Sequence, residues 1–229
     1  MAEFRMMCAL AVRAPFDRVV LPAYTAGGGS IELFWGPTTL IQDKLARGEA
    51  TDAVLLTTEA VDGLIADGTL EAETRVAVAT SQLGVAVARG APQPDLSTAD
   101  RFRQALLDAR SVAFSHGGAS GIYFAKLIER LGIAEVIRAK ATIIPAGFTA
   151  EKLVSGEADL AIQQVSELMV VDGIDIVGPF PAAVQATMRF AAAAVAGSPA
   201  RAAVLLFLAT LRTPQAMAAF RDCGLEPAV

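Results

Sequence analysis

The sequence predicts an α/β protein whose sheets are mostly parallel and covered by helices. Short apolar runs of strand length alternate with segments of helical spacing along nearly the whole chain of 229 residues. Several of these runs lead into turns of small and hydroxyl residues that open a helix, most clearly between Ser111 and Leu131. Hydrophobic residues make up 54% of the chain and charged residues 19%, which is typical of a packed globular protein.

The first part of the chain alternates strand and helix. Strands are expected at residues 6–12, 31–35 and 53–56, and helices at 16–24, 40–45 and 59–67. Pro15 is placed to open the first helix and Thr58 to cap the third, while Gly48 and Gly68 are placed to close the second and third. This alternation favours a parallel sheet.

A second block of similar size follows. Its strands are expected at residues 83–88, 112–115, 141–145, 160–164 and 174–181, and its helices at 99–108, 122–131, 150–155 and, as one turn, 166–169. Thr98 and Thr149 are expected to cap helices, and Gly132 and Gly156 to end them. A strand at 188–195 and helices at 200–211 and 214–222 complete the chain. Two α/β lobes would place a ligand cleft where strand ends meet helix N-termini.

Composition excludes several classes of partner. The net charge is −5 without a basic run, and one Trp and two Tyr leave little for stacking, so nucleic acid is not an expected partner. No apolar segment is long enough to span a membrane. Cys8 and Cys223 are expected to be buried free thiols rather than a disulfide. With a single histidine, a zinc site is not expected either, and we expect no metal and no cofactor.

The turn at residues 115–121 is the strongest candidate for a binding site. Helix N-termini present backbone N–H groups that suit an anion. Ser115 and Ser120 supply hydroxyl groups, and Gly118 and Ala119 lie between them, with glycine allowing close approach of the backbone to a ligand. His116 is either a surface residue or a group that binds an anion or moves a proton.

Other strand-to-helix junctions carry further candidates. Arg13 is either a carboxylate clamp or a surface arginine. Thr38 and Thr39 either cap a helix, contact the ligand, or divide these roles. Phe148 and Thr149 form a helix start beside the expected pocket. Gln163, Gln164 and Ser166 come at the end of a buried strand, and we expect at least one of them to face the cleft. Gln163 and Gln164 point to opposite faces, so we expect only one of these two to contact the ligand.

Four stretches resemble the type II periplasmic solute-binding proteins, in particular the molybdate-binding-protein-like branch. They are Val-Ala-Val-Ala-Thr-Ser-Gln-Leu-Gly-Val-Ala-Val at 76–87, Ser-His-Gly-Gly-Ala-Ser-Gly-Ile at 115–122, Leu-Val-Ser-Gly-Glu-Ala-Asp-Leu-Ala-Ile at 153–162, and the ending from Thr213 to Ala228. The resemblance implies two lobes, residues 1–82 with 187–229 and residues 83–186, joined by hinge crossings near 83 and 182–188. It also implies a small anionic ligand held in the cleft between the lobes of a monomer.

The resemblance implies an ABC transporter permease as partner if the protein is secreted. The first residues lack the basic start, apolar run and cleavage site of a secretory leader. The expected compartment is the periplasm if a leader precedes Met1, and the cytoplasm if the chain is complete as written.

Two departures from the molybdate binders point to an organic ligand. Those proteins usually place a serine after the first strand and a tyrosine after the strand that follows the Glu-Ala-Asp stretch, whereas this chain has residues 11–14 without serine and has Gln163-Gln164. An arginine and two amides suit an organic carboxylate better than a bare oxyanion. We therefore expect a carboxylate-binding component of an ABC-type uptake system. The alternative is an isomerase of an unsaturated di- or tricarboxylate, similar to aconitate isomerase, with His116, Ser120 or Thr39 moving protons.

Overall fold

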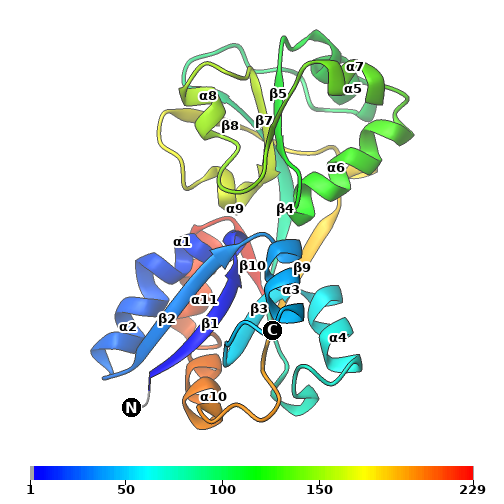
Figure 1. Ribbon diagram of the computed structural model, residues 1–229. Coiled ribbons are helices and arrows are strands. Elements are labelled where there is room, and N and C mark those ends of the chain that lie inside the picture. Colours follow the sequence, from blue (N-terminus) through cyan, green and yellow to red (C-terminus); the bar gives the residue numbers. More distant parts are fainter. Residues whose placement is uncertain (1–2, 229) are drawn as a thin grey trace. The chain divides into compact units, whose positions relative to one another are not determined.

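The computed structural model describes residues 3–228, and the chain divides into two compact units (Figure 1). Unit 1 comprises Met1–Thr80 with Arg189–Val229, and unit 2 comprises Ser81–Met188. The chain passes between the units in strands β4 (Val76–Ala88) and β9 (Thr187–Ala194). Each unit is a sheet flanked by helices, so the predicted α/β class is confirmed.

The sheet of unit 1 is parallel except at one side. β1 (Glu3–Ala9) lies between β2 (Ser30–Gly36) and β3 (Ala53–Thr57) and is parallel to both, with Met6 opposite Leu33 and Ala53. β9 pairs antiparallel with β3, and β10 (Leu225–Pro227) pairs with β4. The C-terminal ends of β1, β2 and β3 therefore share one edge.

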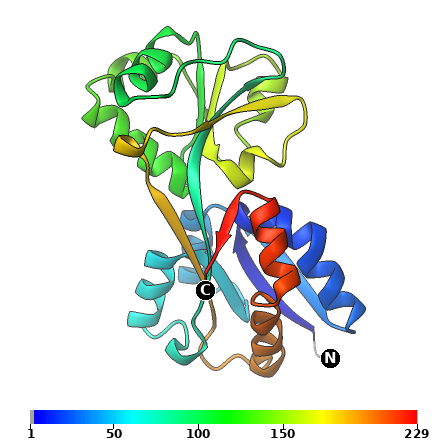
Figure 2. The same ribbon diagram turned by 180° about the vertical axis from the view of Figure 1, so that it is seen from behind.

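Alternation along the strands divides the unit 1 core between two faces. Met7, Val54 and Leu56 pack against α3 (Thr38–Ala46) and α4 (Thr58–Ala66) through Ile41 and Val61. Phe4 points to the other face, where it packs against Phe207 of α10 (Arg201–Thr210). The centroids of the two rings are 5.6 Å apart. Figure 2 shows α10 together with α11 (Pro214–Asp222) from behind.

The first helix begins earlier than predicted. β1 ends at Ala9, and a 3₁₀ turn (Leu10–Val12), α1 (Arg13–Pro15), a π-helical turn (Phe16–Val20) and α2 (Leu21–Ala26) follow without a break. Residues 10–12 were predicted as strand because a short apolar run does not distinguish a strand from a buried helical turn. Pro15 lies inside the helix, where it cannot donate a backbone hydrogen bond, and the helix widens directly after it.

Unit 2 has a five-stranded sheet in the order β8–β4–β7–β5–β6. β5 (Val112–Ser115), β6 (Ala141–Ile144) and β7 (Leu160–Gln164) are parallel, whereas β4 runs antiparallel to β7 and to β8 (Ile174–Pro179). Leu83 lies opposite Gln164. The start of the unit 2 part of β4 therefore lies at the same edge as the ends of β5 and β7.

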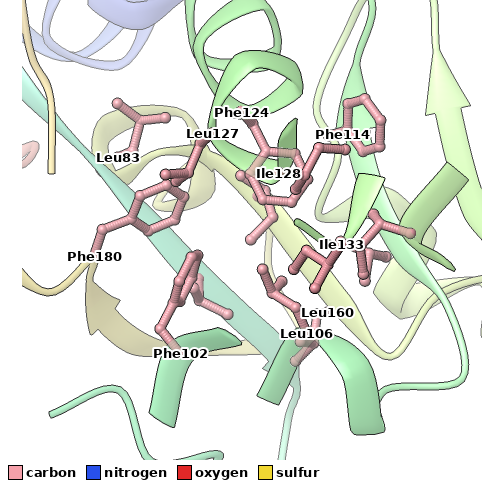
Figure 3. Packing of buried hydrophobic residues seen from close by; sticks show 14 of the residues in the cluster. Leu83, Phe102, Leu106, Phe114, Phe124, Leu127, Ile128, Ile133, Leu160 and Phe180 are labelled. Carbon is pink, nitrogen blue, oxygen red and sulfur yellow. The ribbon is translucent and has the colours of Figure 1, made fainter. Parts of the chain in front are cut away.

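Helices cover both faces of this sheet. Leu83, Phe114 and Leu160 pack on one face against α5 (Ala99–Asp108), α6 (Ala119–Arg130) and α7 (Ala134–Ala139), as Figure 3 shows. Ala113 and Ala161 face the other way, toward α8 (Glu151–Val154) and α9 (Val165–Leu168). α7 and β10 were not predicted, and α6 begins at Ala119 rather than at residue 122.

Most predicted helix ends are confirmed, and two predicted caps are wrong. The Thr98 hydroxyl accepts the N–H of Arg101 at 3.2 Å, and Gly48, Gly68, Gly132 and Gly156 have φ between 65° and 81° after their helices. Thr58 is inside α4, whose N-cap is Thr57, and Ala150 rather than Thr149 is the N-cap of α8. The prediction of buried free thiols at Cys8 and Cys223 is confirmed.

No single helix within residues 3–228 is long and apolar enough to cross a membrane. By length and composition α10 and α11 meet that criterion only as a pair, and they are bent by 64° at their junction.

Candidate functional site

Buried polar side chains gather at one edge of unit 2. This edge holds the C-terminal ends of β5 and β7, the turns that follow them, and the start of the unit 2 part of β4. Its buried polar residues are Ser81, Ser115, Ser120, Thr149, Gln163, Gln164, Ser166 and Glu167. Burying so many polar groups is unfavourable unless each has a hydrogen-bond partner. Their hydrogen bonds therefore show which groups are paired within the fold and which could bind a ligand.

The β5–α6 turn is closed tightly around Ser115. A Cβ at Gly121 would lie 1.7 Å from the Ser115 carbonyl oxygen, and one at Gly118 would lie 2.7 Å from its hydroxyl. Gly118 has φ −82°, so close packing rather than an unusual backbone conformation requires glycine there. Gly118 is also the N-cap of α6 and has no side chain to accept a hydrogen bond, which leaves the start of this helix to be satisfied by other groups.

Ser115 is buried without a hydrogen-bond partner for its hydroxyl. Within residues 3–228 three buried side-chain atoms lack a partner: Tyr24 Oη in unit 1, and Ser115 Oγ and Gln164 Oε1 at this edge of unit 2. An unsatisfied buried polar atom costs about 1–3 kcal/mol, so each one in a native fold requires an explanation. Two such atoms beside a helix start are consistent with a site that takes a polar ligand.

Gln163 and Thr149 hold the β6–α8 loop. Gln163 Oε1 accepts the Thr149 N–H at 2.7 Å and lies 3.0 Å from its hydroxyl, while Gln163 Nε2 donates to the Gly147 carbonyl at 3.0 Å. Both ends of the amide are therefore used inside the fold. Phe148 is buried in the same loop. Gln164 and Glu167 form a capping box in which the Gln164 side chain faces the Glu167 N–H, but Gln164 Oε1 makes no hydrogen bond of ordinary geometry.

Glu167 follows Gln164 by one helical turn. Its carboxylate accepts the Gln164 N–H at 3.3 Å, and its side chain is part of a residue that is only 6% exposed. Among residues 3–228 it is the only buried Asp, Glu, Lys, Arg or His. Burial raises the pKa of this carboxyl from 4.5 to about 7, more than the hydrogen bonds from Gln164 and Gln163 lower it.

Ser166 links α9 to β4. Its hydroxyl lies 3.5 Å from the hydroxyl of Ser81, and both residues are fully buried. Ser81 is the first residue of unit 2, so the hydroxyl pair joins the edge to the strand along which the chain enters the unit.

The turns at this edge contain no Lys or Arg. Residues 115–121, 145–150 and 163–168 carry only backbone N–H groups, hydroxyls, amides, His116 and Glu167 as polar groups. His116 is exposed, and its backbone N–H donates to the Ile144 carbonyl at 2.9 Å. An anion at this edge would therefore be bound by neutral donors and helix N-termini rather than by a cation.

The candidates in unit 1 occupy the corresponding edge of its own sheet. Arg13 lies one turn after the end of β1, its Nε is 3.3 Å from Asp17, and its guanidinium lies 6.0 Å from the centre of the Trp35 ring. Thr38 and Thr39 are the first two residues of α3, behind the N-cap Pro37. Neither threonine is therefore the cap, and all three residues are partly exposed.

Two polar residues of the unit 2 edge were not predicted. Glu167 and Ser81 belong to stretches that the sequence marks only as a helical turn and as part of a strand. The spacing of Gln164 and Glu167, an N-cap residue and the third residue of a helix, was the available signal for Glu167. No sequence signal paired Ser81 with Ser166, which is far away in the chain.

A large hollow of unit 2 lies at the edge opposite to these polar groups. It has a volume of about 700 Å³ and is lined by both apolar and charged residues, including Ala88 and Leu160. Its arginines are already paired, Arg110 with Asp159 at 2.8 Å and Arg101 with Asp95 at 3.7 Å. This hollow therefore offers a ligand fewer unsatisfied polar groups than the edge at Ser115 and Gln164.

Comparison with known proteins gives one family and one fold. Residues 4–226 match the model of the bacterial extracellular solute-binding proteins. The chain is 38% identical over 217 residues to an aconitate isomerase from a Pseudomonas species, covering 92% of this chain and 82% of the relative.

Two solved structures show the same fold at low identity. One is the periplasmic molybdate-binding protein of Azotobacter vinelandii, with TM-score 0.79, 16% identity and coverage of 97% and 98% of the two chains. The other is the sulfate-binding protein of Mycobacterium tuberculosis, with TM-score 0.79, 17% identity and coverage of 100% and 88%. The fold is thus that of the type II periplasmic binding proteins, and the chain belongs to the family of bacterial extracellular solute-binding proteins.

Proposed function

We propose that this protein binds an unsaturated tricarboxylate and shifts its double bond, as an aconitate isomerase does. The observation that carries the proposal is the 38% identity to an aconitate isomerase over nearly the whole chain. The match covers 92% of this chain and 82% of the relative.

The chemistry of the unit 2 edge supports this proposal. Moving a double bond requires removal of a proton next to one carboxylate and addition of a proton at another carbon. The substrate carboxylates need donors, and the α6 N-terminus with Ser115, Ser120 and Gln164 supplies neutral ones. The proton transfer needs a group whose pKa lies near the working pH, and Glu167 has one.

Proton NMR tests the proposal directly. The purified protein is incubated with trans-aconitate and, separately, with cis-aconitate. We expect each sample to approach the same mixture of the two isomers, and a heat-denatured sample to leave both unchanged. Spectra that stay constant over hours at high protein concentration would contradict the proposal.

A second function rests on the family rather than on the individual relative. As a solute-binding component of an ABC-type uptake system, the protein would hold an organic carboxylate and pass it to a permease from the periplasm. The family match over residues 4–226 supports this alternative. The same polar edge would then bind the ligand without changing it.

Thermal-shift screening separates the ligand classes. Molybdate, sulfate, phosphate and a set of di- and tricarboxylates are compared at equal concentration. An organic carboxylate is expected to raise the melting temperature, and stabilisation by molybdate alone would contradict both proposals. A ligand that binds but is recovered unchanged supports the solute-binding function over the isomerase.

A further inference from the structure

We propose that Glu167 is the catalytic residue that carries the proton between the two carbons of the substrate. This inference rests on the proposed isomerase function. Neither the sequence candidates His116, Ser120 and Thr39 nor the family match points to this residue. The argument depends on where Glu167 lies, on what surrounds it, and on what its local structural role leaves unexplained.

Glu167 lies among the groups expected to hold the substrate. It is the third residue of α9, in a capping box with the N-cap Gln164, and it lies next to Ser166, whose hydroxyl is 3.5 Å from that of Ser81. Ser115, whose buried hydroxyl has no partner, ends the strand that lies beside β7. The Glu167 carboxylate is itself at this edge, because it accepts the N–H of Gln164, the last residue of β7, at 3.3 Å.

The backbone cap made by Glu167 does not require a carboxyl group, although the side chains of Gln163 and Gln164 also hydrogen-bond this carboxyl. Its one hydrogen bond to the backbone, the acceptor at 3.3 Å from the Gln164 N–H, would be made equally by the amide oxygen of a glutamine. A glutamine would avoid the large desolvation penalty of a buried carboxylate. The cap by itself therefore does not account for an acid at this buried position.

The surroundings leave Glu167 free to exchange a proton. The turns at this edge carry no Lys or Arg to hold it as a permanent anion. β7, which precedes it, has no titratable side chain, and on β8, which packs against α9, Asp175 binds the Gly90 N–H at 2.8 Å. With a pKa near 7, the carboxyl is present in both protonation states around neutral pH.

The proposed step balances without any further reactant. The carboxylate of Glu167 removes a proton from the methylene carbon of the substrate, and the C–H electron pair becomes the new double bond to the central carbon. The electron pair of the old double bond moves to the former vinyl carbon, which takes the proton back from the neutral Glu167. Hydrogen-bond donors at the edge stabilise the charge that builds up on the substrate carboxylates during the shift.

The experiment compares Glu167→Gln with Glu151→Gln, a matched change at an exposed position in unit 2. Isomerisation of trans-aconitate and incorporation of deuterium from D₂O are followed by NMR, and binding by calorimetry. We expect Glu167→Gln to bind within a few-fold of wild type but to lose at least about 100-fold in both rates, the usual scale for a general base. Glu151→Gln is expected to behave as wild type.

A second variant distinguishes the loss of a proton carrier from a purely structural effect of the substitution. Acetate is expected to restore part of the isomerisation rate of Glu167→Ala, because a small carboxylic acid can replace the missing proton carrier, whereas it would not restore a misfolded site. If Glu167→Gln turns over within about three-fold of the wild-type rate, the loss is far smaller than that expected for removal of a general base. This result overturns the role of Glu167 and leaves the isomerase function intact. Loss of binding in Glu167→Gln also overturns it. A wild-type protein that binds aconitate without converting it overturns the proposed function itself.

Discussion

Gln185 binds Leu83 through both ends of its amide. Its Oε1 accepts the Leu83 N–H at 3.1 Å, and its Nε2 donates to the Leu83 carbonyl at 3.0 Å. Leu83 belongs to the strand by which the chain enters unit 2, and Gln185 lies just before β9, by which it leaves. One side chain therefore ties the entering and leaving segments of this unit together.

Replacing Gln185 by alanine is expected to destabilise the protein by about 1–3 kcal/mol, because the Leu83 N–H loses its partner in a partly buried position. Urea unfolding measures the change. Gln104→Ala, which removes an amide from the exposed face of α5, is the control and is expected to change stability by under about 0.5 kcal/mol. Equal effects of the two substitutions would show that the hydrogen bonds of Gln185 stabilise the protein no more than an exposed amide does.

Gly121→Ala is expected to destabilise the protein by about 3 kcal/mol or more, because its Cβ would lie 1.7 Å from the Ser115 carbonyl oxygen and α6 must shift. The matched control is Gly63→Ala in α4, where an added Cβ meets nothing within 4 Å. That substitution is expected to stabilise by about 0.5–1 kcal/mol through helix propensity. Thermal or urea unfolding of both variants gives the comparison, and a tolerated Gly121→Ala would show that the β5–α6 turn is less tightly closed.

Ser115→Ala separates stability from binding. The hydroxyl is buried without a partner, so its removal is expected to leave the free energy of unfolding unchanged or slightly higher. If the hydroxyl bonds the ligand, affinity for the carboxylate falls by about 0.5–1.5 kcal/mol. Unfolding and calorimetric titration are measured on the same preparation. A variant that is destabilised while its affinity is unchanged would remove Ser115 from the site.

Arg13→Ala tests the candidate clamp of unit 1. Its ion pair with Asp17 is about half exposed and contributes little to stability. Loss of a charge-assisted bond to a carboxylate is expected to weaken binding by about 1.5–3 kcal/mol. Arg47→Ala, at another exposed ion pair of unit 1, is the control and is expected to bind normally. Normal affinity of Arg13→Ala would exclude a ligand role for this arginine.

The stability of the protein is expected to depend on pH through Glu167. Its pKa is raised from 4.5 to about 7 in the folded state, so between these values the folded state keeps a proton that the unfolded chain releases. Stability from this residue is therefore full below about pH 4.5 and declines as the pH rises to about 7. The total decline is at most about 3.5 kcal/mol, from about 1.4 kcal/mol for each unit of the pKa shift.

Urea unfolding of wild type and Glu167→Gln across this pH range measures the effect. The stability difference between the two proteins is expected to shift in favour of the variant as the pH rises, because glutamine does not titrate. Glu151→Gln, with an exposed side chain, should show no such trend relative to wild type. A difference that stays constant with pH would mean that Glu167 titrates normally.

Local patterns predicted most of the elements but not their exact starts. The alternation of apolar strands with helical spacing was enough for the α/β class, and Thr98 and the glycines after the helices acted as predicted. The run at residues 10–12 failed because a helical turn buried on all sides has the same apolar composition as a strand. Thr149 failed as a cap because its hydroxyl and N–H are used by Gln163 from another strand.

The sequence by itself determined the class of fold, the family resemblance and the strand-to-helix turns that offer backbone donors, because these follow from periodicity and from residues close together in the chain. Only the tertiary structure decided which polar groups at these turns are already used and which are not. The Gln163 side chain is bonded to Thr149, Gln164 forms a capping box with Glu167, the Ser115 hydroxyl has no partner, and Glu167 is buried without a cation. Burial and long-range hydrogen bonds depend on strands that are distant in sequence, and they decide which side chain remains available for chemistry.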